Sequence, residues 1–285
     1  MLRERKPDIL HGHYLTSAGL LCLFSGFRPY ALTAHGSDVI GCMKSFLQKN
    51  YLRIILRQAS LVNTVSDELA VLVGKLGVPD EKILVCTPGV DTKLLRYQLP
   101  GVLRSPVTLL CTRRLAKVFD PVTIINACEI LKRESISFRL TFAAGGPLER
   151  QLQNLVSEKN LTDQVTFMAG YDNCALPELL HNHDIYLSAS HWDGTSISLL
   201  EAMACGLFPV VSRIRSNQAW LKDGQTSLMF ECGNAAELAE KIMRAMEEHK
   251  LRQTAVEKNR ELVMEKGDRE KNMLLLERKY YKIIQ

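Results

Sequence analysis

The sequence lacks several features that would mark other classes of protein. Its eight cysteines never form a Cys-x-x-Cys pair, which argues against a zinc or redox site and favours buried free thiols in a reducing compartment. It has no run of 18 apolar residues free of charge, so we predict no membrane-spanning helix. The first ten residues, MLRERKPDIL, carry too many charges for a signal peptide.

Composition excludes two further classes. Hydrophobic residues make up 46% of the chain and charged residues 24%, which excludes disorder as the main state. The net charge of +5, from 36 basic and 31 acidic residues, is too small to indicate a nucleic-acid partner. We therefore expect a globular, cytoplasmic protein of about two domains for 285 residues.

Short β-rich runs alternate with helical stretches along the whole chain, which predicts parallel, doubly wound sheets of the α/β class. Most of the runs are continuously apolar, as expected of strands covered on both faces. The predicted strands are residues 8–11, 30–33, 61–64, 83–86, 107–111, 138–143, 165–168, 185–188, 209–211 and 229–231.

The two halves are unequal. We predict a partial N-terminal Rossmann-like domain over residues 1–100, which opens directly on a strand, and a full doubly wound domain over residues 101–250. The break between them falls near residues 100–106. Residues 251–285 are polar, with a helical pattern and no strand signal.

The most informative stretch is residues 188–212, SASHWDGTSISLLEAMACGLFPVVS. A strand ends at Ser188, small residues follow, and a helix is predicted from about Ser198 to Ala204, ended by Gly206. Parallel sheets bind ligands beyond the carboxyl ends of their strands, and a helix start there offers free N–H groups to a phosphate. Asp193 and Glu201 carry carboxylates that pair well with sugar hydroxyls. Equally, residues 198–201 (SLLE) form a capping box in which Glu201 only satisfies the backbone.

Residues 193–211 resemble the signature of glycosyltransferase family 4, retaining sugar transferases of the GT-B fold. Further motifs of that family follow the same order along residues 8–245: His35-Gly36-Ser37-Asp38, Asn63-Thr64-Val65-Ser66, Pro88-Gly89-Val90-Asp91, Ala144-Gly145-Gly146-Pro147 and Val165-Thr166-Phe167 with Gly170. The resemblance implies two Rossmann-like domains, the first of them incomplete, with the last helix packing back on the first domain.

The resemblance also implies roles for individual residues. Glu201 would bind the ribose of a nucleoside-diphosphate-sugar, Asp193 the transferred sugar, and His35 the sugar or the distal phosphate. The loop residues Gly194 and Thr195 lead to backbone N–H groups that would hold the diphosphate, at Ser196, Ile197 and Ser198. Arg113 or Arg114, with Lys117, would neutralise that diphosphate. Gly145 and residues 167–170, including Gly170, would line the base pocket. The chain has no Asp-x-Asp, so a metal-bridged diphosphate is not expected, in agreement with the metal-independent fold that the resemblance implies. No cofactor is expected beside the donor substrate, a nucleoside-diphosphate-sugar.

Four departures from the family pattern qualify this reading. Asp193 stands where Glu is usual. The basic residues Arg113, Arg114 and Lys117 lie closer together than the family's Arg and Lys, with Val118 or Phe119 where the Lys is expected. The loop of residues 213–220 has no glutamate. The family's N-terminal glycine-rich loop and first strands are missing, which indicates a fragment, a late-start gene model or half of a split enzyme.

Other residues leave two interpretations open. His11 and His13 are a metal pair or, more simply, cleft-wall residues, and no third ligand is evident. Lys49, Arg53 and Arg57 repeat every four residues beside Phe46, Leu52, Ile55 and Leu56, a face for anionic lipid or a plain solvated helix face. Trp192 either stacks on a sugar ring or packs its loop.

We therefore predict a retaining glycosyltransferase that moves a sugar from a nucleoside-diphosphate-sugar to a carbohydrate or lipid-linked acceptor. It would work in polysaccharide or glycoconjugate biosynthesis, in the cytoplasm or at the cytoplasmic face of the membrane. One alternative is a weak or inactive sugar-nucleotide-binding protein that partners another chain supplying the N-terminal region. The other is a GT-B nucleotide-sugar epimerase, for which no convincing set of acid–base carboxylates is present.

Overall fold

The computed structural model describes residues 7–99 and 101–285, and the chain forms two compact units. One unit takes the chain up to Gly89 together with Arg269–Gln285, and the other takes Val90–Asp268. The first boundary therefore falls at residue 89 rather than 100, and the C-terminal segment is divided at residue 268. Two predictions fall partly outside the described residues. The first is the absence of a signal peptide, which rests in part on residues 1–6. The second is the break between domains, which includes residue 100.

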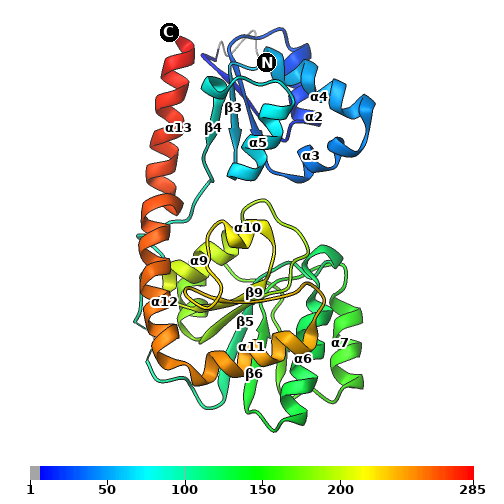
Figure 1. The fold of residues 1–285 in the computed structure, drawn as a ribbon, viewed down its shortest axis with the longest axis vertical. Helices are drawn as coiled ribbons and strands as arrows, with labels where there is room; N and C mark the ends of the chain where they lie inside the picture. The colour runs from blue at the N-terminus through cyan, green and yellow to red at the C-terminus, as the bar shows by residue number, and fades with distance from the viewer. Residues whose placement is uncertain (1–6, 100) are drawn as a thin grey trace. The chain divides into compact units, whose positions relative to one another are not determined.

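The first unit is built on a parallel sheet in the order β1-β2-β3-β4 (Figure 1). Its strands are β1 (Leu10–His13), β2 (Tyr30–Ala34), β3 (Leu61–Thr64) and β4 (Ile83–Val85). Helices α2 (Ser17–Phe24), α4 (Phe46–Gln58) and α5 (Asp67–Lys75) bury their apolar side chains against one face. Helix α13 (Arg269–Ile284) packs on the other face through Leu276. A short helix, α3 (Ser37–Ile40), follows β2.

The second unit holds a six-stranded parallel sheet in the order β10-β9-β8-β5-β6-β7. The strands are β5 (Val107–Cys111), β6 (Phe138–Phe142), β7 (Val165–Phe167), β8 (Ile185–Ser188), β9 (Phe208–Ser212) and β10 (Leu228–Phe230). The chain builds outward from β5 in one direction through β6 and β7, and then in the other through β8, β9 and β10. The order therefore reverses between β5 and β8, which is the switch point of a doubly wound sheet.

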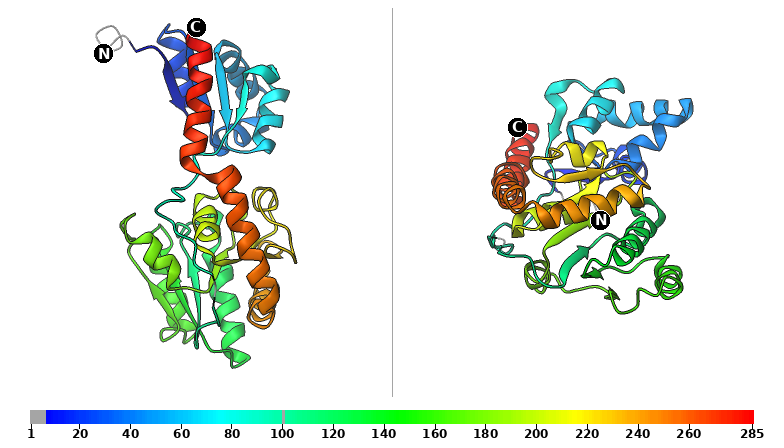
Figure 2. Two further views of the ribbon diagram at one scale, coloured as in Figure 1. Left: turned by 90° about the vertical axis from the view of Figure 1, so that its left-hand side faces the viewer. Right: turned by 60° about the horizontal axis from the view of Figure 1, so that its bottom comes forward.

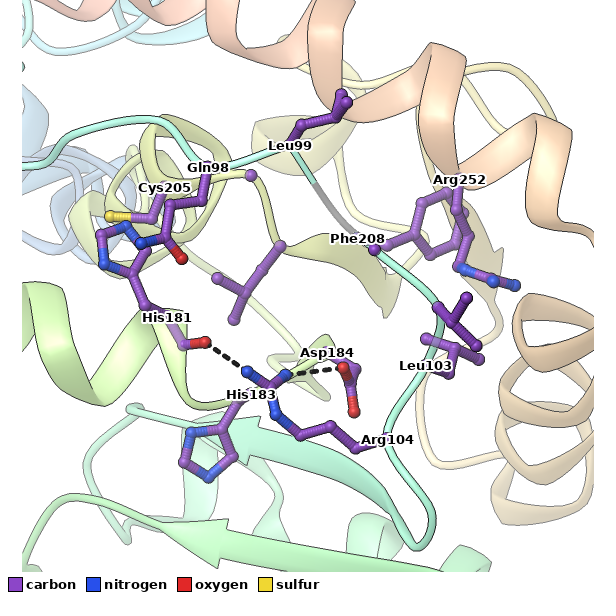
Figure 3. Close-up of a pocket in the computed structure, with 14 residues that line it drawn as sticks. Gln98, Leu99, Leu103, Arg104, His181, His183, Asp184, Cys205, Phe208 and Arg252 are labelled. Atoms are coloured by element: carbon purple, nitrogen blue, oxygen red, sulfur yellow. Dashed lines mark hydrogen bonds and ion pairs between the residues drawn. The ribbon is translucent and has the colours of Figure 1, made fainter.

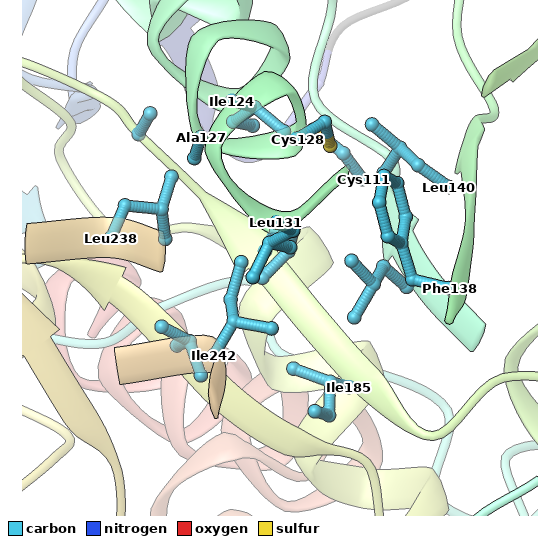
Figure 4. Close-up of a cluster of buried hydrophobic side chains, with 14 of the residues drawn as sticks. Cys111, Ile124, Ala127, Cys128, Leu131, Phe138, Leu140, Ile185, Leu238 and Ile242 are labelled. Carbon is cyan, nitrogen blue, oxygen red and sulfur yellow. The ribbon is translucent and has the colours of Figure 1, made fainter. Parts of the chain in front are cut away.

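Helices cover both faces of this sheet (Figure 2). The helices are α6 (Pro121–Arg133), α7 (Glu149–Glu158), α8 (Leu176–His181), α9 (Ile197–Cys205), α10 (Arg215–Gln218), α11 (Ala235–Glu247) and α12 (His249–Leu262). Alternate residues of β5 enter different cores, Leu109 on the α6 and α11 face and Leu110 on the α8 and α9 face. The first of these cores, in which Ile124, Leu131 and Ile242 meet, is shown in Figure 4.

Most predicted strands are confirmed to within a residue or two. The largest error is at β1, which begins at Leu10 and not at residue 8. The prediction of helix over residues 251–285 is confirmed, with a π-helical turn at Val263–Gly267 between α12 and α13. Among the described residues, no helix is long and apolar enough to cross a membrane.

We expect Gly206→Ala to lower the stability of the second unit. Gly206 ends α9 in a left-handed conformation with φ of 92°, and an added Cβ would lie 2.4 Å from the Gln98 carbonyl oxygen. The conformation and the overlap together should lower the free energy of unfolding by about 3 kcal/mol in urea denaturation.

Gly233→Ala is the matched control for that substitution. Gly233 also has positive φ, 78°, but no atom lies within 4 Å of its added Cβ. We expect it to lose only about 1 kcal/mol. Equal losses in the two variants would show that the approach of residue 98 to this helix end contributes nothing.

Candidate functional site

The candidate site lies at the switch point of the six-stranded sheet. Two loops leave the carboxyl ends of neighbouring strands there, residues 112–120 after β5 and residues 189–196 after β8. The backbone N–H of His191 donates to the Val118 carbonyl, and the His191 ring contacts Asp120 at 3.0 Å. The two loops are therefore tied together at the position where open parallel sheets bind their ligands.

Helix α9 begins at this crevice, one residue earlier than predicted. Its N-cap is Ser196, whose hydroxyl accepts a hydrogen bond from Leu199 N at 3.2 Å. The capping-box interpretation, with Ser198 as cap, is thus wrong. Glu201 is the fifth helical residue rather than one of the first turn, and its carboxylate has no hydrogen bond to any residue that the structure describes.

Arg113 is the cation that the fold directs into the crevice. One guanidinium nitrogen, Nη1, donates to the hydroxyls of Ser196 (3.0 Å) and Ser198 (3.1 Å). The other, Nη2, forms an ion pair with Asp193 Oδ2 at 2.6 Å. The guanidinium also lies over the Phe119 ring, 4.1 Å from its centre. This arrangement places a fixed positive charge at the start of α9.

The other two basic residues predicted for this site differ from Arg113. Arg114 and Lys117 are exposed, and within the described chain their side chains form no hydrogen bond or ion pair. The structure thus shows that only one of the three cations, Arg113, is held in a fixed orientation, whereas the other two are solvated. The sequence alone did not distinguish the three.

Glu201 lies in partly buried surroundings beside Arg113. Burial raises the pKa of this carboxyl to about 7, and the nearby guanidinium offsets only part of that effect. Burial, followed by the charge of Glu201, likewise raises the pKa of Tyr171 to about 12. Burial also raises the pKa of Asp193, against the opposing charge of Arg113. The site thus holds carboxylates in a poorly solvated crevice, where hydroxyl donors would bind them strongly.

The remaining predicted residues of this unit surround the same edge. Gly194 N donates to Asp193 Oδ1 at 2.9 Å, and Thr195 and Ile197 flank the N-cap. Gly145 O accepts from Leu115 N at 3.1 Å, which joins the loop after β6 to the loop after β5. Gly170, with φ of 131°, follows β7.

Two residues at the site were missed by the sequence analysis as contributors. Phe119 supports Arg113, although it was noted only as a departure from the family's spacing. Tyr186, in the middle of β8, is fully buried and donates to Ser198 Oγ at 3.0 Å. A tyrosine in an otherwise aliphatic strand was the available signal, because a buried hydroxyl needs a partner.

His35 lies in the first unit, on the loop after β2. Asp38 shapes that loop by accepting backbone hydrogen bonds from Leu15, His35 and Gly36. The His35 ring is 3.0 Å from the His13 ring, nitrogen to nitrogen. Burial and then His13 lower the pKa of His35, so this imidazole is neutral at pH 7.

His11, the other residue of the proposed metal pair, is engaged by protein groups. Its ring nitrogens contact the hydroxyls of Thr33 (2.7 Å) and Tyr280. Burial lowers its pKa to about 4. No group of three or more metal-ligating side chains suited to a metal ion occurs in the described part of the chain.

The proposed lipid-binding face of α4 is mostly a core face. Leu52, Ile55 and Leu56 are buried in the first unit, and of the four apolar residues in that prediction only Phe46 is exposed. The apolar half of the pattern is therefore explained by packing on the sheet.

A cavity of about 320 Å³ in this unit lies at the opposite ends of its strands (Figure 3). Its charged groups Arg104 and Asp184 are already paired, since Arg104 binds both Asp184 at 2.7 Å and the His181 carbonyl. Asp184 also accepts from Thr108. The pairing fits a structural tie and not a free ligand site.

This geometry defines a class: a doubly wound α/β protein with a cation, a helix start and two carboxylates at its switch point, one of them paired with the cation. Comparison with known proteins specifies the family. The family model "Glycosyl transferases group 1" matches residues 102–262, more than half of the chain, and "Glycosyltransferase Family 4" matches residues 1–94. The chain belongs to the glycosyl transferases group 1 family.

Curated relatives agree with this assignment. The chain is 26% identical to N-acetyl-alpha-D-glucosaminyl L-malate synthase of Bacillus anthracis, over 97% of this chain and 75% of that protein. It is 29% identical to the putative colanic acid biosynthesis glycosyltransferase WcaL of Escherichia coli K12, over 73% of this chain and 56% of that protein. The chain thus spans three quarters of the first relative and just over half of the second.

Solved structures show the same fold. Sucrose-phosphate synthase from Thermosynechococcus elongatus superposes with a TM-score of 0.84 at 20% identity, over 99% of this chain and 75% of that one. Anabaena Alr3699/HepE in complex with UDP and glucose gives 0.82 at 16% identity, over 96% and 78%. Two parallel α/β units of this kind are the GT-B architecture, as the sequence predicted.

The raised pKa of Glu201 makes a prediction about stability. The folded chain holds this proton more tightly than the unfolded chain does, since the pKa rises from 4.5 to about 7. The free energy of unfolding should therefore fall as pH rises through that interval. Glu201→Gln removes this loss, so the variant should gain about 2–3 kcal/mol over the wild type between pH 4.5 and pH 8. Urea denaturation at the two pH values measures it, and an unchanged difference would contradict the burial of this carboxyl.

Proposed function

We propose that this protein is a retaining glycosyltransferase that transfers a sugar from a nucleoside-diphosphate-sugar to a carbohydrate or lipid-linked acceptor. Its role would lie in polysaccharide or glycoconjugate biosynthesis, in keeping with the name of the WcaL relative. The observation that carries the proposal is the convergence of Arg113, Glu201 and the start of α9 on one crevice of a doubly wound sheet.

The start of α9 would bind the diphosphate. The first N–H groups of a helix have no partner within the helix, and its dipole favours negative charge there. Arg113 adds a full positive charge at the same point, held by the two serine hydroxyls. Lys117 and Arg114, both solvated, would add charge from the loop that precedes α6. These cations would supply the charge that a metal ion supplies in other phosphate sites, so the proposal includes no metal.

Glu201 would bind the ribose. It lies one helical turn beyond the proposed diphosphate position, and its carboxylate has acceptor capacity that no described residue uses. Two neighbouring ribose hydroxyls would donate to it, and such hydrogen bonds favour the charged form that burial disfavours. Donor binding should therefore lower the pKa of Glu201 from about 7.

The chemistry would depend on stabilising the leaving group. The bond between the sugar's anomeric carbon and the diphosphate breaks, and the departing oxygen gains negative charge beside Arg113. The acceptor hydroxyl forms the new bond on the same face and passes its proton to the departing diphosphate. Asp193, which pairs with Arg113 and accepts a hydrogen bond from Gly194 N, would accept hydrogen bonds from the sugar rather than act as a nucleophile.

Saturation-transfer NMR against UDP-, GDP- and ADP-sugars tests the donor site. We expect one base series to bind, and Glu201→Gln to weaken that binding at least about tenfold, because charge-assisted hydrogen bonds to ribose are lost. Glu158→Gln, on an exposed residue at the end of α7, is the matched control and should leave binding unchanged. A folded chain that binds none of the donors would refute the proposal.

Retention can be tested without knowing the acceptor. If water replaces the acceptor, hydrolysis of UDP-α-glucose, or of whichever donor binds, should first release the α-anomer, at an enzyme concentration that makes release faster than mutarotation. Proton NMR distinguishes the anomers before they equilibrate. Initial release of the β-anomer would contradict the retaining mechanism.

A further inference from the structure

The ion pair between Arg113 and Asp193 occupies the guanidinium edge that a diphosphate would use. Nη2 is 2.6 Å from Asp193 Oδ2, and the two side chains are only 11% and 16% exposed. Nη1 is committed to Ser196 and Ser198, and the Phe119 ring covers one flat face of the group. The remaining donor, Nε, has no hydrogen-bond partner but is buried, so it offers a ligand no exposed edge. A ligand can therefore reach the guanidinium only by replacing one of its present contacts.

Carboxylate and phosphate oxygens accept hydrogen bonds from a guanidinium in the same geometry. A diphosphate at the start of α9 would thus displace Asp193 from Nη2. The displaced carboxylate would retain one protein donor shown here, Gly194 N at 2.9 Å. A buried carboxylate that loses its counter-charge is destabilised unless new donors replace it.

Whether new donors arrive depends on what is bound. A nucleoside-diphosphate-sugar brings sugar hydroxyls next to its diphosphate, and these can donate to the released Asp193. A nucleoside diphosphate brings none, so Asp193 would compete to recover Arg113. The same exchange is therefore favourable with the donor and unfavourable with the product.

We propose that Asp193 is a specificity residue, whose ion pair with Arg113 makes the site prefer a nucleoside-diphosphate-sugar over a free nucleoside diphosphate. This inference rests on the proposed function, since it places the donor's diphosphate at α9. The re-forming ion pair helps to expel the nucleoside diphosphate after transfer. Phe119 is a positioning residue that keeps the guanidinium in place during the exchange.

Calorimetric titration tests the preference as a ratio of dissociation constants. The probes are UDP with UDP-glucose, GDP with GDP-mannose and ADP with ADP-glucose, and inorganic diphosphate serves as a probe without a base. In Asp193→Asn, Arg113 has no anionic competitor, so inorganic diphosphate and the nucleoside diphosphate should bind about three- to tenfold more tightly. The sugar nucleotide should gain nothing or bind more weakly, so the preference for it should fall about tenfold.

Two further variants keep the result interpretable. Asp193→Ser also removes the charge, with a smaller side chain, and should give the same change in the ratio. It replaces the asparagine variant if that variant folds poorly. Asp163→Asn, on an exposed residue just before β7, is the matched control and should leave the ratio unchanged. Phe119→Leu should weaken nucleoside diphosphate and sugar nucleotide by a similar factor, because the ring acts on both through Arg113.

The outcomes separate this inference from the proposed function. If the wild type binds a sugar nucleotide through Glu201 but Asp193→Asn leaves the ratio unchanged, the specificity role is overturned and the donor site stands. If no sugar nucleotide binds to the wild type, the proposed function and this inference fall together. A collapsed ratio in both Asp193 variants, with Asp163→Asn unaffected, supports the role.

Discussion

The site depends on one constraint: a guanidinium held in a poorly solvated crevice must keep its hydrogen bonds and a counter-charge. The terminal nitrogens of Arg113 meet it with two serine hydroxyls and the Asp193 carboxylate, the Phe119 ring covers one face of the group, and only Nε is buried without a partner. Each partner comes from one of the loops or helix starts that follow β5 and β8. The reversal of strand order between these two strands is what opens the crevice, so the topology and the electrostatics of the site have the same origin.

The hydroxyl chain behind Arg113 extends this constraint into the core. Tyr186, buried in β8, donates to Ser198, which in turn accepts from Arg113. The start of α9 is thus held both by a hydrogen bond from strand β8 and by hydrogen bonds from Arg113. A rigid cation costs little reorganisation when charge develops beside it, which is the property that leaving-group stabilisation requires.

Much of this architecture could be predicted from the sequence, for identifiable reasons. Continuous apolar runs located β5 and β8 to the residue, because strands buried on both faces leave that pattern without interruption. The ordered motifs identified the family and the GT-B fold. The predicted helix over 198–204 was one residue short at each end, because Ser196 and Ser198 are equally good caps by type and only the backbone distinguishes them.

Side-chain pairing was the part that the sequence could not provide. Three basic residues, Arg113, Arg114 and Lys117, were equivalent candidates until the fold oriented one and left two solvated. The spacing of α4 was compatible with a lipid-binding face as well as with the favoured solvated face, and only the fold shows that Leu52, Ile55 and Leu56 are buried in the first unit. In both cases the outcome depends on the direction in which a side chain points. The spacing of residues along a single helix or loop does not determine that direction.

A crystal structure of the chain with the sugar nucleotide that it binds tests the proposed donor site most directly. We predict the diphosphate on the N–H groups at the start of α9 and on Arg113, with the ribose hydroxyls on Glu201 and the sugar next to Asp193. A nucleotide bound away from the β5–β8 switch point, or bound there with Glu201 contacting only protein, would contradict it.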